Sequence, residues 1–111
     1  MSYLMNSKKT AKSKRAPFPR SVLYAKEFKK DWQRLERSGR YDMNALKTVI
    51  AALILNDAPL GAEYRDHQLT GNYESFRECH IGGDFLLIYQ INDEKNGIEF
   101  ARAGTHADLF E

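Results

Sequence analysis

The sequence predicts an α+β fold, in which two N-terminal helices pack on one face of a small antiparallel β-sheet. Apolar residues recur at helical spacing between residues 25 and 55, and three strand-like runs separated by turn residues follow between residues 73 and 103. Helices followed by consecutive strands are the order typical of an α+β domain. With 111 residues, the chain is long enough for one small core and too short for two.

The N-terminal segment differs from the rest of the chain in its charge. Residues 1–20 carry six Lys or Arg and no acid, which leaves eleven bases against fifteen acids in residues 21–111. Such a polar segment buries too little apolar surface to stay ordered alone. We therefore expect a flexible basic tail over residues 1–19 and one domain over residues 20–111. The tail is either a nucleic-acid-binding arm or an extended start upstream of Met5, and the sequence does not separate the two.

A strand and a helix are predicted at the start of the domain. The strand covers residues 21–24, and the helix covers residues 25–38, where apolar residues recur at helical spacing. Gly39 follows where a C-terminal glycine cap belongs. The outward positions of this helix are basic, so in a body that is otherwise acidic they are the best candidates for an RNA-facing surface. The residues expected to contact RNA there are Lys29, Lys30 and Arg34.

A second helix is predicted from the capping residue Asp42 to the turn-forming residues 56–61. Its broad apolar face indicates burial in the core, and the short link over residues 39–41 indicates a helix hairpin.

The remaining chain is predicted to form a loop and a three-stranded meander. Residues 62–72 lack periodicity and are expected to present His67 from a loop. Strands are expected over residues 73–81, 85–91 and 98–103, joined by turns rich in Gly, Asn and Asp. The first strand of the domain can pair with this meander.

Composition argues against membrane and secreted classes. The sequence has no run of eighteen apolar residues and no apolar stretch behind its N-terminal bases, so neither a spanning helix nor a signal peptide is indicated. We therefore expect a cytoplasmic protein without a membrane partner. The single cysteine, Cys79, cannot form an internal disulfide, which agrees with a reducing compartment.

All three histidines lie in the last third of the chain, at His67, His80 and His106. Imidazole has an unperturbed pKa of about 6.5, so such a group suggests acid–base chemistry or metal ligation. Zinc could use Asp84 or Cys79 as a further ligand, but no closely spaced ligand pair supports a metal site. A single histidine is more often structural than catalytic. Acid–base chemistry and metal ligation therefore both require the fold to bring the three histidines together.

The simplest chemistry for converging histidines is metal-independent RNA cleavage, in which the 2′-hydroxyl attacks the neighbouring phosphate. One group removes the hydroxyl proton, another protonates the leaving oxygen, and a cation stabilises the charged phosphorane. Arg77 or Arg102 could supply that cation. Phe110 is either a stacking surface for an unpaired base or an anchor that closes the core.

Three segments resemble the YafQ branch of the RelE/ParE superfamily of bacterial toxins. They read Asp66-His67-x-Leu69-x-Gly71, Phe76-Arg77-x-x-His80 and Gly104-Thr105-His106-Ala107-x-Leu109-Phe110. The resemblance implies an mRNA interferase that enters the ribosomal A site and cuts the message without a metal or other cofactor. It further implies a cognate antitoxin, and binding of operator DNA only through the toxin–antitoxin complex.

The resemblance also implies functional residues. His67, His80, Asp84 and His106 occupy the family's catalytic positions, and Phe110 occupies that of its functional aromatic residue. Phe85 stands where a relative has a tryptophan, and it is expected to keep a stacking surface for the substrate. Apart from the resemblance, the candidate cations Arg77 and Arg102 are also expected to contact substrate.

The alternative function is that of a ParE-like toxin, which shares the superfamily fold but inhibits DNA gyrase by binding. A gyrase inhibitor has no need of the histidines, so they favour the nuclease. A third interpretation is an inactive remnant that acts only in repression, and no catalytic position is missing that would favour it.

Overall fold

The computed structural model describes residues 19–56 and 58–111, so the basic tail predicted for residues 1–19 lies outside the described residues apart from Pro19. Its elements in chain order are β2 (Ser21–Tyr24), α1 (Lys26–Ser38), α2 (Met43–Leu55), β3 (His67–Gln68), β4 (Arg77–Gly82), β5 (Phe85–Asn92), β6 (Gly97–Thr105) and α3 (His106–Phe110). Short 3-10 turns cover Ala62–Tyr64 (η1) and Gly71–Tyr73 (η2). No helix in the described ranges is long and apolar enough to cross a membrane.

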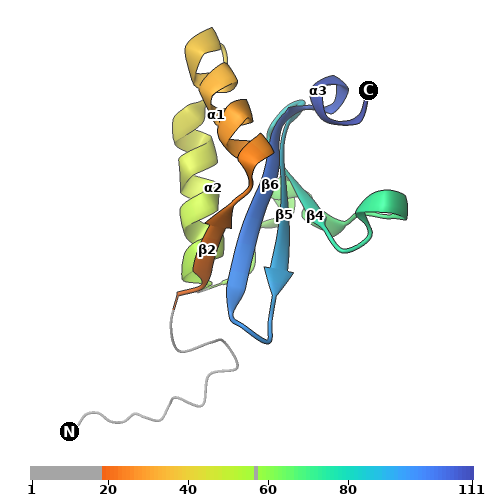
Figure 1. The fold of residues 1–111 in the computed structure, drawn as a ribbon. Coiled ribbons are helices and arrows are strands. Elements are labelled where there is room, and N and C mark those ends of the chain that lie inside the picture. The colour runs from red at the N-terminus through yellow and green to blue at the C-terminus, as the bar shows by residue number, and fades with distance from the viewer. Residues whose placement is uncertain (1–18, 57) are drawn as a thin grey trace, which may run out of the picture.

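The strands form one five-stranded sheet in the order β2-β6-β5-β4-β3. Neighbouring strands from β3 to β6 are antiparallel, whereas β2 pairs in parallel with β6. Helices α1 and α2 lie on one side of the sheet, and α3 lies on the other (Figure 1). The predicted α+β fold is confirmed, and the parallel strand β2 makes its sheet mixed instead of wholly antiparallel.

Capping contacts confirm the predicted end of the first helix and the predicted start of the second. Gly39 takes the left-handed conformation at φ +69°, and its N–H donates to the Glu36 carbonyl at the end of α1. The Asp42 side chain accepts a hydrogen bond of 2.9 Å from the N–H of Ala45, which satisfies a free donor in the first turn of α2. The link between them is short, so the helices form the expected hairpin.

The main core lies between this hairpin and the sheet. Apolar side chains of both helices meet one face of β4, β5 and β6, because alternate strand residues point to the same side. Its most deeply buried members include Leu35, Leu46, Leu87, Tyr89 and Phe100.

A smaller cluster holds α3 on the opposite face. Leu109 packs against Leu86 and Ile88, which point away from the main core. The helix starts at Thr105 with a capping box, in which the Thr105 hydroxyl accepts from the Asp108 N–H and the Asp108 carboxylate accepts from the Thr105 N–H. This helix was not predicted, since five residues are too few to show a helical period.

The segment between α2 and β4 also differs from the prediction. His67 lies on the two-residue strand β3 instead of a loop. Strand β4 starts at Arg77 and not at Tyr73, because the N–H of Phe76 donates back to the Tyr73 carbonyl at 2.9 Å in a turn. Strand β6 is longer than predicted and runs to Thr105.

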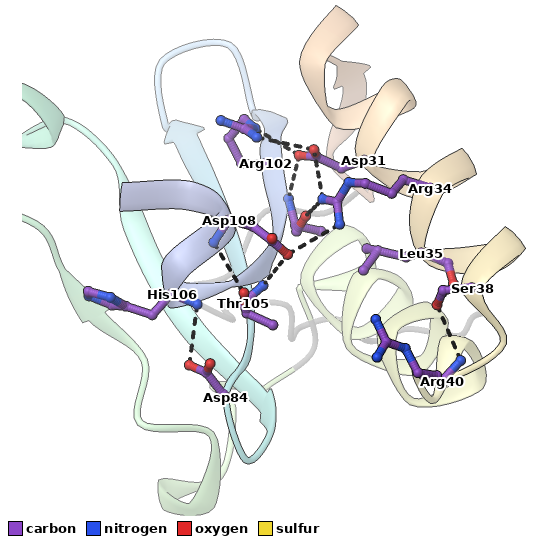
Figure 2. A network of polar contacts seen from close by, with 11 residues as sticks. Asp31, Arg34, Leu35, Ser38, Arg40, Asp84, Arg102, Thr105, His106 and Asp108 are labelled. Atoms are coloured by element: carbon purple, nitrogen blue, oxygen red, sulfur yellow. Dashed lines mark hydrogen bonds and ion pairs between the residues drawn. The ribbon is translucent and has the colours of Figure 1, made fainter. Parts of the chain in front are cut away.

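Helix α1 replaces β2 as the neighbour of β6 beyond Phe100, where the pairing with β2 ends. There the Asp31 carboxylate accepts from the Ala103 N–H at 3.0 Å and from Arg102 Nε at 2.7 Å, while Arg34 Nη2 donates to the Ala103 carbonyl at 3.4 Å (Figure 2). Asp31 is only 4% exposed. Side chains of α1 thus form hydrogen bonds with backbone groups at the edge of β6 that no strand covers. Buried backbone groups require such partners.

Replacing Asp31 with Ala should lower the free energy of unfolding by about 3 kcal/mol, because a buried N–H and a guanidinium lose their partner. Urea denaturation measures this loss. Glu36→Ala, an exposed change on the same helix, is the control and should stay within about 0.5 kcal/mol. Equal stability of the two variants would show that the Asp31 contacts contribute little.

Cys79 should be unreactive in the folded protein. Its side chain is fully buried, and burial, followed by the charges of Asp66 and Glu78, raises the pKa of the thiol to about 12. Thiolate is the reactive form, so titration with a disulfide reagent at pH 8 should detect no thiol before denaturation and one thiol per chain in urea. Rapid labelling of the native protein would contradict the packing of β4 against the helices.

Candidate active site

The first group of candidate residues centres on Glu78, a carboxylate on β4 that is 7% exposed. Its Oε2 lies 3.4 Å from His80 Nε2 and 3.6 Å from His67 Nε2. The two imidazole rings have centroids 6.4 Å apart. Strand geometry explains the arrangement, because Glu78 and His80 alternate onto one face and β3 pairs His67 with Glu78. A poorly solvated carboxylate needs polar partners, and the two imidazoles are within reach of it.

The tautomer of His67 follows from a backbone contact. His67 Nδ1 lies 2.7 Å from the Arg65 carbonyl oxygen, which can only accept, so Nδ1 carries a proton. Nε2 is then the nitrogen that faces Glu78. This group presents two imidazoles whose Nε2 atoms both lie near one carboxylate.

The second group lies where β6 passes into α3. The N–H of His106 donates to Asp84 Oδ1 at 3.2 Å, so Asp84 holds the backbone of His106 and not its ring (Figure 2). The His106 ring packs against Phe110 at a tilt of 38°, with centroids 4.9 Å apart, and the rings of Phe110 and Tyr73 meet nearly at right angles, with centroids 5.5 Å apart. His106 is exposed, and its ring is available to a ligand.

The strand register relates the two groups. His80 pairs with Leu86, and Leu86 pairs with Gly104 next to the start of α3. Leu86 and Ile88 form the surface on which α3 packs. Both groups therefore lie on the face that α1 and α2 leave uncovered, with β5 between them. The fold brings all three histidines and Asp84 to this face, near the turn between β4 and β5.

The two arginines expected to bind substrate from β6 and α1 are engaged within the protein. Arg102 donates through Nε and Nη2 to Asp31, and this hydrogen bond outweighs burial to raise the pKa of the guanidinium. Arg34 bridges Asp31 and Asp108, at 3.2 Å to each. Lys29 and Lys30 are exposed on α1, where Lys29 lines a cavity between the two helices.

The Arg34–Asp108 contact ties α1 to α3. The Thr105 N–H, the Thr105 hydroxyl and Arg34 together outweigh desolvation and lower the pKa of Asp108. Gly104 lies beneath this pair, and a β-carbon there would be 3.0 Å from Asp108 Oδ2 and 3.2 Å from Arg34 Nη2. A side chain at Gly104 would therefore crowd the bridge that secures α3.

Two further residues expected to contact substrate lie on the opposite face of the sheet. Phe85 is 6% exposed and packs on Tyr41 with ring centroids 5.1 Å apart, so it belongs to the core and offers no open stacking face. Arg77 alternates away from His80, and its Nε donates to Asp66 at 2.7 Å. Period-two alternation separates both side chains from the histidines.

Two residues of the site were not predicted. Glu78 shares a strand face with His80, so alternation indicated its side, but its place between two histidines depends on the pairing of β3 with β4. No sequence pattern indicated that Tyr73 belongs to the site, since only the turn η2 brings it to Phe110. Within the described ranges, no three His, Cys, Asp or Glu side chains are arranged to hold a metal ion.

Known proteins are similar to this chain in sequence. A family model described as a bacterial toxin of type II toxin-antitoxin system, YafQ, matches residues 20–111. The mRNA interferase toxin YafQ of Escherichia coli strain K12 is 40% identical over 91 residues, which cover 82% of this chain and 96% of that protein. A putative toxin YafQ of Haemophilus influenzae is 37% identical over 92 residues, which cover 80% and 90%.

Solved structures of YafQ are also similar to this chain. The crystal structure of YafQ from Escherichia coli strain BL21(DE3) matches with a TM-score of 0.75 at 38% identity, covering 83% of this chain and 99% of that one. The Escherichia coli DinJ-YafQ complex matches with a TM-score of 0.73 at 39% identity, with the same coverage. On this evidence, the chain belongs to the YafQ family of toxins from bacterial type II toxin–antitoxin systems.

Proposed function

We propose that this YafQ-family toxin is an endoribonuclease that cuts mRNA in the ribosomal A site by histidine acid–base catalysis. One observation carries the proposal, namely that three histidines and Glu78 lie on the uncovered face of the sheet around the turn between β4 and β5. The curated Escherichia coli relative is named an mRNA interferase toxin, which supports the same reaction class. Residues 20–111 act as the toxin domain, in agreement with the span of the family match.

The reaction we infer is transesterification within the RNA. The 2′-oxygen loses its proton and forms a bond to the adjacent phosphorus, the bond from phosphorus to the 5′-oxygen breaks, and the 5′-oxygen takes up a proton. The products are a 2′,3′-cyclic phosphate and a free 5′-hydroxyl. One base, one acid and a positive charge on the phosphorane are required, and imidazole supplies all three near neutral pH.

The geometry suggests how the roles divide. His67 and His80 share Glu78, so they are suited to hold the phosphate with a protonated ring and to exchange a proton through Nε2. His106 stands apart on α3 and acts as a proton-transfer group from the other side of β5. Asp84 fixes the backbone of His106, which makes Asp84 a positioning residue in this scheme.

Aromatic side chains give this site a means of holding an unpaired base. Phe110 contacts both the His106 ring and the Tyr73 ring, and Tyr73 is 37% exposed. Stacking on such a surface contributes about 1–3 kcal/mol per base in single-stranded recognition. We therefore assign Phe110 and Tyr73 to the base next to the scissile phosphate.

Ribosome binding and regulation involve other surfaces. Lys29 and Lys30 are exposed charges on α1 and are suited to contact ribosomal RNA. Arg34 and Arg102 are instead paired with Asp31 and help to stabilise the fold. A cognate antitoxin is the expected partner, since a YafQ relative forms a complex with DinJ. Operator DNA is bound only through that complex, and the protein works in the cytoplasm with the ribosome.

Cleavage of a defined message on programmed ribosomes tests the proposal. Ribosomes need Mg²⁺, so a transition-metal chelator is added to toxin that was stripped with EDTA beforehand. The native chain should cut within A-site codons, and His106→Ala should cut at least about 100-fold more slowly because it lacks a proton-transfer group. An intact message with folded, antitoxin-free protein would contradict the nuclease, and inhibition of gyrase supercoiling would then identify a ParE-like toxin.

Glu78→Gln should lower the single-turnover cleavage rate by about tenfold or more, because a neutral amide cannot stabilise positive charge that develops on His67 or His80 during the reaction. The matched control is Glu99→Gln on β6, a partly buried carboxylate that is not bound to a histidine in this structure. Single-turnover cleavage on ribosomes with the same message measures both variants. Equal rates for Glu78→Gln and the native chain would remove Glu78 from the site.

A further inference from the structure

We propose that Asp66, Arg77 and Tyr89 form a positioning network that holds His67 in the active site from the opposite face of the sheet. The inference rests on the proposed function, in which His67 acts at the scissile phosphate. It also gives Arg77 a role other than substrate binding.

His67 needs such an anchor because its own strand is minimal. β3 has two residues, lies at the edge of the sheet and pairs with β4 alone. Short edge elements open at low free-energy cost, since few hydrogen bonds hold them. The His67 side chain is 51% exposed and has little packing of its own. Fixing a neighbouring residue would therefore help to hold a catalytic group in register at this place.

The network fixes the residue next to His67 in the chain. Tyr89 on β5 pairs directly with Arg77 on β4, and both point toward the helices. Arg77 Nε donates to Asp66 Oδ1 at 2.7 Å, and the Tyr89 hydroxyl donates to Asp66 Oδ2. Tyr89 is 1% exposed and belongs to the main core. Both carboxylate oxygens of Asp66 are therefore attached to the rigid centre of the sheet.

Protonation states agree with these contacts. Burial, together with the hydrogen bond to Asp66, raises the pKa of Tyr89, so the phenol remains a donor. Burial alone would lower the pKa of Arg77, but its hydrogen bond to Asp66 and the Asp66 charge raise it overall. The network thus persists over the pH range in which imidazoles titrate.

The backbone transmits this attachment to the imidazole. Successive residues alternate between faces, so fixing Asp66 on the helix side fixes His67 on the catalytic side. Arg65, at φ +48°, turns the chain so that its carbonyl oxygen meets His67 Nδ1 at 2.7 Å. Loss of the Asp66 contacts would let this turn move, and the ring would lose both its position and its preferred tautomer.

A cavity of about 470 Å³ adjoins the network on the helix side, lined by Asp66, Arg77 and Tyr89 together with Leu53 and Pro59. Small changes to the polar groups are accommodated there without displacing core side chains. Tyr89→Phe and Asp66→Asn are therefore suitable variants, and the folded state of each is checked by thermal unfolding. Tyr41→Phe, at a partly buried tyrosine that packs on Phe85, is the control for removing a hydroxyl.

The decisive measurement is a double-mutant cycle with His67→Ala, using kcat and KM for cleavage of one message on ribosomes. In the native background, Tyr89→Phe and Asp66→Asn should each lower kcat about tenfold to a hundredfold with little change in KM, as expected for a misplaced catalytic group. In the His67→Ala background, the same changes should alter kcat by less than about twofold. Equal losses in both backgrounds, or a rise in KM alone, would overturn the proposal.

A second readout does not depend on RNA cleavage. Nitrogen NMR of the imidazoles in free protein should show the Nδ1-protonated form for His67 in the native chain when the ring is neutral. Asp66→Asn should give mixed tautomers or broadened signals for His67 and leave His106 unchanged. An unchanged His67 spectrum would refute the network even if the native protein cuts RNA, and a changed spectrum without any cleavage would refute only the proposed function.

Discussion

The buried carboxylate of Asp31 is the contact on which the arrangement of this protein depends. Strand β2 covers the edge of β6 only as far as Phe100, and beyond that point the edge would expose unpaired backbone groups inside the fold. Asp31 and its neighbour Arg34 supply the missing partners from α1. One helical turn thereby joins the helix hairpin, the end of β6 and, through Asp108, the helix that carries His106.

The sheet separates stability from chemistry by its two faces. The face under α1 and α2 holds the main apolar core, to which Phe85 and Tyr89 contribute. The other face is covered only partly by α3, and it carries the histidines and Glu78. Polar networks on the closed side reach the open side through the backbone, because neighbouring strand residues point in opposite directions.

Much of the fold could be predicted because local chemistry specified it. The Gly39 and Asp42 caps, the helical spacing of apolar residues and the turn-forming residues between strands act over a few positions. The predictions that were wrong concern strand boundaries and short elements. Strand β3 exists because β4 lies beside it, and the five residues of α3 are helical because Leu109 packs on the sheet and Thr105 caps the first turn. Neither condition is visible in a local pattern.

The sequence by itself determined the class of fold, the residue types suited to acid–base chemistry and the family motifs around His67, His80 and His106. Tertiary structure alone decided which of the predicted residues share a site. Glu78 meets His67 through the pairing of β3 with β4, and the pairing of β5 with β6 brings the start of α3 to the same face. The physical reason is that a catalytic site depends on distances between side chains far apart in the chain, and strand register sets those distances.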